Sequence, residues 1–152
     1  MSAILGIDLG ERRIGVAIAA DASDRARPLA TLPRGASTAA DVVALLALVP
    51  GGPPSEVVVG LPLEASGSEG PQARLSSAWA TEAAPLLGCP VRLRDERLSS
   101  HLAEERLGPM KRGRSGGPPT PTQRRAYRAR VDREAAAILL QDELDARVQG
   151  GS

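Results

Sequence analysis

The order of apolar and polar positions along the chain predicts alternating strands and helices. Apolar runs predict five strands, at Ala3–Leu9, Ile14–Ala20, Leu29–Leu32, Glu56–Gly60 and Val91–Arg94. The first two are separated by the short segment Gly10–Arg13, which favours a tight turn with a glycine at its start. The run Glu56–Gly60 is rich in β-branched residues, a pattern typical of a strand buried inside a parallel sheet.

Helical periodicity accounts for most of the remaining chain. It predicts helices over about 38–49, over Pro71–Leu87, over Ser99–Leu107 and over about Gln123–Val148. Ser37 or Thr38 is the expected cap of the first helix, and Ser68 or Glu69 is expected at the start of the second. The segment Gly108–Thr122 is rich in proline and glycine and is expected to form a flexible loop.

This order of elements predicts an α/β fold in one domain that spans residues 1–152. The first three strands, with their short connections, form an antiparallel meander, and the later strands join the same sheet in parallel through right-handed crossovers. The result is a mixed five-stranded sheet flanked by helices, which is the element order of the ribonuclease H-like fold. In that fold the first strand is central, so Asp8 is expected in the middle of the sheet.

Composition excludes several classes of protein. The chain has 152 residues, enough for one domain with a working core. Its single cysteine, Cys89, permits no internal disulfide, and its one histidine, His101, cannot build a His/Cys metal cluster. The longest apolar stretches are too short to cross a membrane, and no signal peptide is expected. These features predict a cytoplasmic protein without a membrane partner.

The basic residues are unevenly distributed along the chain. Between Arg106 and Arg133 there are nine basic residues and one acid, a local charge of +8. The whole chain carries +1, so the remainder carries −7. Charge segregated in this way predicts a surface for a polyanion, with a solvated loop as the alternative interpretation.

Three acidic positions lie where regular structure begins or ends. Asp8 lies inside the first apolar strand, Asp95 and Glu96 close the fifth, and Asp132 lies where the basic segment enters the alanine-rich last helix. A carboxylate in an apolar strand is costly to bury unless it is paired or bound to a metal. If the three positions meet at one sheet edge, their oxygens would suit Mg²⁺ or Mn²⁺.

Short motifs follow one another along nearly the whole chain. They are Ile7–Gly10 with Arg13–Ala17, Val58–Leu63, Gly67–Ala73, Asp95–Ser99, and Val131–Asp132 leading into Ala136–Gln141. Together they resemble the YqgF (RuvX) family of bacterial ribonuclease H-like nucleases, relatives of the RuvC junction resolvases. Two departures concern substrate contacts: Glu64–Gly67 stands where the family often has an Asn-x-Asp-Gly turn, and Glu11 stands where a small or basic residue is common.

The resemblance implies a phosphodiesterase that uses two Mg²⁺ or Mn²⁺ ions. Asp8 would be shared by both ions, with Glu96 and Asp132 each completing one side and Asp95 as the alternative to Glu96. Three arginines near this edge are expected to hold phosphates: Arg12, Arg13 and Arg97. Five arginines of the basic segment are expected to bind the nucleic acid: Arg112, Arg114, Arg124, Arg125 and Arg128.

The leading hypothesis is hydrolysis of phosphodiester bonds in RNA, and the resemblance implies trimming of the 5′ end of precursor 16S ribosomal RNA during ribosome biogenesis. A structure-specific DNA endonuclease of the junction-resolving type would use the same acids as a symmetric dimer; monomer and homodimer both remain open. A catalytically silent module that binds RNA or the ribosome is the alternative from another class. An ATPase of the actin and heat-shock chaperone type also opens with Ile-Asp-Leu-Gly, but it needs a duplicated and much longer fold.

Overall fold

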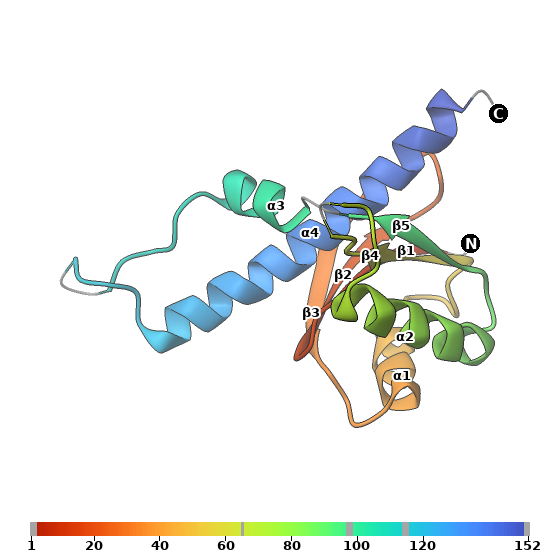
Figure 1. Ribbon diagram of the computed structural model, residues 1–152, viewed down its shortest axis with the longest axis horizontal. Coiled ribbons are helices and arrows are strands. Elements are labelled where there is room, and N and C mark those ends of the chain that lie inside the picture. Colours follow the sequence, from red (N-terminus) through yellow and green to blue (C-terminus); the bar gives the residue numbers. More distant parts are fainter. Residues whose placement is uncertain (1–2, 65, 97–98, 114–115, 151–152) are drawn as a thin grey trace.

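The computed structural model describes residues 3–64, 66–96, 99–113 and 116–150, which form five strands and four helices (Figure 1). The strands are β1 (Ile4–Leu9), β2 (Arg13–Ala19), β3 (Arg27–Pro33), β4 (Glu56–Leu61) and β5 (Val91–Asp95). The helices are α1 (Thr38–Leu48), α2 (Pro71–Leu87), α3 (Ser99–Leu107) and α4 (Pro121–Gln149). Every predicted strand and helix is confirmed, and no end is displaced by more than two residues.

The strands form one mixed sheet in the order β3-β2-β1-β4-β5. β2 pairs antiparallel with β1 and β3, whereas β4 pairs in parallel with β1 and β5. The predicted meander and the predicted parallel pairing are both confirmed. β1 is therefore central, and Asp8 lies opposite Gly15 of β2.

The start of α2 differs from the prediction. Gly70 is the N-cap residue and Pro71 the first helical residue, so the expectation of Ser68 or Glu69 at the helix start was wrong. No side chain caps this end, because the N-cap residue is a glycine; proline at the first helical position has no N–H that needs a partner. The predicted cap of α1 by Ser37 is confirmed.

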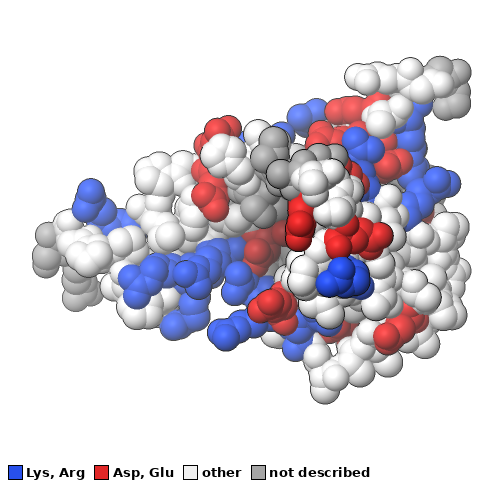
Figure 2. Space-filling model, in the orientation of Figure 1, with Lys and Arg blue, Asp and Glu red and all other residues white. Residues whose placement is uncertain are grey.

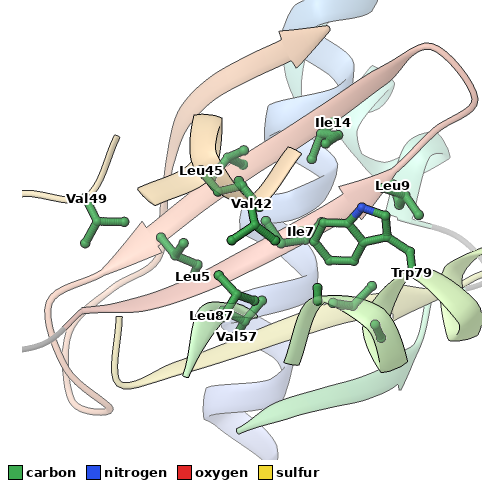
Figure 3. Close-up of a cluster of buried hydrophobic side chains, with 14 of the residues drawn as sticks. Leu5, Ile7, Leu9, Ile14, Val42, Leu45, Val49, Val57, Trp79 and Leu87 are labelled. Atoms are coloured by element: carbon green, nitrogen blue, oxygen red, sulfur yellow. The ribbon is translucent and has the colours of Figure 1, made fainter. Parts of the chain in front are cut away.

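Alternation of side chains along the strands divides the core into two layers. On one face of the sheet, apolar side chains of β1, β2 and β4 pack with α1 and α2 around Trp79, which lies beside Ile7 (Figure 3). On the other face, Ile4 packs against the alanine-rich part of α4. Because side chains alternate, Gly6 and Asp8 face α4 as well.

Two strand glycines let α4 lie directly on the sheet. A Cβ atom at Gly6 would be 2.7 Å from Leu140 Cβ, and a Cβ atom at Gly15 would be 2.0 Å from the backbone oxygen of Asp132. Neither position has room for a side chain. This close packing places the backbone of Asp132 against β2, on the sheet face that also carries Asp8.

The first half of α4 extends past the sheet together with α3 (Figure 1). A capping box between Thr120 and Gln123 begins the helix. Val131 and neighbouring apolar residues of α4 then pack against Ala103 of α3, with Tyr127 at the margin of the cluster. Among the described residues, no helix combines the length and apolarity that a membrane span requires.

Candidate active site

The ends of β1 and β5 bring Asp8 and Glu96 together. Glu96 directly follows β5, and its backbone N–H donates to the Leu61 carbonyl at 3.2 Å. The Glu96 side chain lies over β4 at Gly60, where a Cβ atom would be 2.3 Å from the carboxyl carbon of Glu96. The missing side chain at Gly60 therefore provides the space in which Glu96 reaches Asp8.

The Asp8 and Glu96 carboxyl groups share one proton. Burial raises the pKa of Asp8 to about 6, because desolvation disfavours the charged form. Burial likewise raises the pKa of Glu96 to about 10, and the charge of Asp8 and a hydrogen bond with it add to this effect. Glu96 therefore carries the proton at neutral pH and donates a hydrogen bond to Asp8. Within the part of the chain that the structure describes, Glu96 Oε2 is buried without a hydrogen-bond partner.

Asp132 approaches the pair from α4. Its Oδ2 accepts a hydrogen bond from Arg13 Nε at 2.5 Å, and its charge contributes to the raised pKa of Asp8. The three predicted acids line one open cleft of about 320 Å³. Among the described residues, no group of three or more His, Cys, Asp or Glu side chains is placed so that it could hold a metal ion. Asp132 is paired with Arg13 in this arrangement, so it would have to give up that bond to join Asp8 and Glu96 around a cation.

The donor set fits a hard divalent cation. Carboxylate oxygens are the ligands that Mg²⁺ and Mn²⁺ prefer. Glu96 offers a buried oxygen that lacks a partner among the described residues, and such an oxygen is costly to bury without a compensating charge. A cation would also remove the repulsion that keeps a proton between Asp8 and Glu96. The residues of the cleft therefore suit the metals that the motifs implied.

Two further cleft residues were not singled out as site residues from the sequence. Gln72, in the first turn of α2, donates from Nε2 to the Leu9 carbonyl at 2.9 Å and so ties α2 to the end of β1. Glu11 also lines the cleft. The available signal for Gln72 was its place beside Pro71, at a helix start that follows a strand end.

A buried acid behind the cleft fixes the turn between β1 and β2. Asp41 of α1 is 1% exposed. It accepts hydrogen bonds from Gly35 N at 2.6 Å, Arg34 Nε at 3.0 Å and Trp79 Nε1 at 3.1 Å. Arg34 also donates to the Gly10 carbonyl at 2.9 Å, which holds the turn in place. The sequence signal was an aspartate in the first turn of an apolar helix, which helix-terminus electrostatics alone would also explain.

The structure places the remaining predicted residues at this edge as follows. Asp95 ends β5, is exposed, and is not among the residues that line the cleft. Arg12 lines an adjoining hollow of about 260 Å³ together with Arg13 and Asp132. Arg97 lies outside the described residues.

The predicted nucleic-acid-binding arginines lie on α4 and on the segment before it. Arg124 and Arg128 precede Asp132 at intervals of four residues, so the three share one face of the helix at steps of roughly 6 Å. Arg112 and Arg125 are exposed, and Arg114 lies outside the described residues. Figure 2 shows Lys and Arg side chains gathered along α4 and acidic side chains beside them, where the helix reaches the sheet.

The architecture is that of the ribonuclease H-like proteins related to RuvC. Thermus thermophilus RuvC matches with a TM-score of 0.51 and 18% sequence identity, over 97% of this chain and 96% of RuvC. The T. thermophilus RuvC structure with a Holliday junction substrate gives a TM-score of 0.50 at 20% identity, over 96% of each chain. At these identities the likeness concerns the fold alone, and it confirms the predicted fold class.

Sequence similarity then identifies the family. The model of the RuvX family, described as a Holliday junction resolvase, matches residues 2–146. A protein of Anaeromyxobacter sp. (strain Fw109-5) named "Putative pre-16S rRNA nuclease" is 45% identical over 143 residues, covering 94% of this chain and 96% of that protein. A protein of the same name from Chloroflexus aggregans (strain MD-66 / DSM 9485) is 41% identical over 144 residues, covering 95% and 94%. The chain belongs to the RuvX family, as its motifs predicted.

Proposed function

We propose that this protein is a metal-dependent nuclease that hydrolyses phosphodiester bonds in RNA. The observation that supports the proposal is the half-buried Asp8–Glu96 pair, which is hydrogen-bonded and lies in one cleft with Asp132. Membership of the RuvX family and the name of its relatives support the same conclusion. A nuclease is a hydrolase that acts on ester bonds.

Asp8, Glu96 and Asp132 would hold two Mg²⁺ or Mn²⁺ ions, with Asp8 shared between them. When bound, the ions would supply an activated water and neutralise charge on the phosphate. Loading requires loss of the proton shared by Asp8 and Glu96, because carboxylates and not carboxylic acids are the ligands. If Asp132 held a cation in place of Arg13, the Arg13 guanidinium could donate two hydrogen bonds to a phosphate of the substrate.

The substrate that we assign is precursor 16S ribosomal RNA, cut at its 5′ end in the cytoplasm, with the ribosome as the larger partner. The name of the relatives supports the choice of this RNA. The arginines of α4 support it physically, because they lead along one helix face towards Asp132 and would follow a phosphate backbone. Either a monomer or a homodimer could perform this cleavage.

Cleavage of branched DNA is the second candidate function. The description of the family model favours it, and it would use the same three acids. A resolvase cuts two strands symmetrically and so needs two active sites in one particle. Sedimentation of a monomer at working concentration would count against this function.

The test compares wild type with Asp8→Ala on three labelled substrates: precursor 16S rRNA, unstructured single-stranded RNA and a four-way DNA junction. Each is incubated with Mn²⁺ and with EDTA. We expect Mn²⁺-dependent cleavage of the RNA by wild type and none by Asp8→Ala. Cleavage of the junction alone would establish the resolvase function instead. Equal products from both proteins would remove the metal mechanism, and tight RNA binding without cleavage would identify a silent binding module.

A further inference from the structure

A second hollow, of about 490 Å³, adjoins the acidic cleft on the side of α3 and α4. It is lined by Arg13, Glu104, Met110, Pro119, Tyr127, Arg128, Val131 and Asp132. Asp132 lines the acidic cleft as well, and Arg13 lines the hollow that adjoins it, so the two spaces are neighbours. We propose that this hollow receives one unpaired nucleobase of the strand that is cut next to it. The inference rests on the proposed nuclease function and specifies the substrate as single-stranded at that point.

The walls of the hollow suit a flat, mainly apolar ring. Met110, Pro119 and Val131 contribute apolar surface, and Tyr127 contributes an aromatic ring. The Tyr127 hydroxyl donates to the Gly108 carbonyl at 2.8 Å, so its ring is fixed between α4 and the end of α3. Proteins that bind single strands use such apolar and aromatic surfaces to hold unstacked bases.

The polar groups at the rim suit a nucleotide rather than a purely apolar ligand. Neither the Glu104 carboxylate nor the Arg128 guanidinium forms a hydrogen bond or ion pair with any residue that the structure describes. The neighbours of Glu104 differ, since Glu105 pairs with His101 and Arg106 pairs with Glu134. Arg128 can therefore hold a phosphate, and Glu104 can accept a hydrogen bond from the edge of a base.

The chemistry of Glu104 predicts which bases the hollow prefers. A carboxylate is an acceptor, so it favours a base edge that carries N–H groups. Cytosine has an amino group at the position where uracil has a carbonyl oxygen, which a carboxylate would repel. In a duplex this edge is already paired and turned inward. The hollow can therefore be filled only by a strand that is unpaired at this nucleotide.

The test measures the affinity of metal-free protein for three RNAs of equal length: oligo(C), oligo(U) and an abasic strand. Fluorescence anisotropy in EDTA avoids cleavage during the measurement. We expect wild type to bind oligo(C) roughly tenfold more tightly than oligo(U), because a hydrogen bond to a charged acceptor is strong, and to bind the abasic strand most weakly. Glu104→Ala should lose the preference for oligo(C), whereas the matched variant Glu105→Ala should keep it, because Glu105 is turned about 100° away around α3 and does not line the hollow.

A second variant tests the space itself. Met110→Trp fills the hollow and should lower the affinity for oligo(C) to that for the abasic strand. Equal binding of oligo(C) and oligo(U) by wild type, or a preference that survives in Glu104→Ala, would overturn the base pocket. These results are separate from the nuclease test: Mn²⁺-dependent cleavage that Asp8→Ala abolishes would stand even if the base preference were absent. If wild type did not cleave RNA with Mn²⁺, the proposed function itself would be wrong.

Discussion

Asp41 and Glu96 are both acids near the segments that shape the cleft, but Asp41 is fully buried whereas Glu96 is half-buried, and their surroundings differ. Asp41 accepts three hydrogen bonds, from a backbone amide, a guanidinium and an indole. Glu96 shares a proton with Asp8, and its Oε2 has no hydrogen-bond partner among the described residues. Asp41 therefore stabilises the metal-free fold, whereas Glu96 costs it stability.

The partners of the two acids distinguish an acid with a structural role from one with a functional role. Burial alone does not identify a site, because the fully buried Asp41 has a structural role while the cleft acids Asp8 and Glu96 are only half-buried. What distinguishes Glu96 is that the charges of two other carboxylates, Asp8 and Asp95, raise its pKa, and that a strand glycine makes room for it. Such a costly group marks a candidate site, because a positive ligand would offset its cost.

Replacement of Asp41 should have the largest effect on stability. Asp41→Asn leaves the partly buried Arg34 guanidinium without its counter-charge and weakens the bond to Trp79. We expect a loss of about 3 kcal/mol in the free energy of unfolding, since breaking a buried ion pair is strongly destabilising. Urea unfolding followed by the fluorescence of Trp79 measures this loss directly.

The matched control for Asp41 is an exposed ion pair. Glu105→Gln removes the partner of His101 on the surface of α3 and should change stability by less than about 0.5 kcal/mol. If the two variants unfolded at the same urea concentration, the hydrogen bonds of Asp41 would not stabilise the fold.

Replacement of Glu96 should have the opposite sign in metal-free protein. Glu96→Gln keeps a donor towards Asp8 but cannot ionise, so it should raise the free energy of unfolding by about 2 kcal/mol at neutral pH. The same variant should lose the increase in melting temperature that Mn²⁺ gives to wild type, because it lacks a charged ligand. Differential scanning calorimetry with EDTA and with Mn²⁺ measures both effects.

The pH dependence of metal-free protein follows from the same pair. Folding raises the pKa of Glu96 from 4.5 to about 10, so folding disfavours its carboxylate form. The contribution of Glu96 to the free energy of unfolding is therefore most favourable below about pH 4.5, and it becomes less favourable as the pH rises towards about 10. Asp8 likewise makes the fold less stable as the pH rises from 3.8 to about 6. In EDTA the melting temperature of wild type should fall across the neutral range, and Glu96→Gln should flatten the slope; parallel slopes would contradict the shared proton.

Gly60→Ala tests the space that Glu96 occupies. The added Cβ atom would come within 2.3 Å of the Glu96 carboxyl carbon and must displace it. We expect a loss of about 1 kcal/mol in stability together with weaker binding of Mn²⁺, measured by titration calorimetry. Gly117→Ala is the control, because a Cβ atom there meets nothing within 4 Å. Unchanged Mn²⁺ affinity in Gly60→Ala would show that Glu96 binds metal from another position or not at all.

The sequence predicted the strands, the helices and the fold class because apolar periodicity and turn residues are local signals. Asp8 could be recognised because a charged residue inside an apolar strand is conspicuous in one dimension. The contact of Asp132 with Arg13 could not be predicted from the sequence, because it depends on how closely α4 packs on Gly15. Asp41 was missed for a similar reason: its partners lie on a loop and on another helix, so nothing near it in the sequence shows that it is satisfied.

The smallest expected effect concerns Ser76, which compares a neutral buried atom without a hydrogen-bond partner with the charged group of Glu96. Its Oγ on α2 is also buried without a hydrogen-bond partner among the described residues, but it is neutral and is not part of the cleft lining. Ser76→Ala should therefore stabilise the protein by up to about 1 kcal/mol, because it removes an unsatisfied hydroxyl, and should leave Mn²⁺ affinity and cleavage rate unchanged. Thermal unfolding and a single-turnover cleavage assay check the two expectations. A drop in Mn²⁺ affinity would mean that a neutral buried atom without a hydrogen-bond partner also affects metal binding. The charge of Glu96 would then not explain its role at the site.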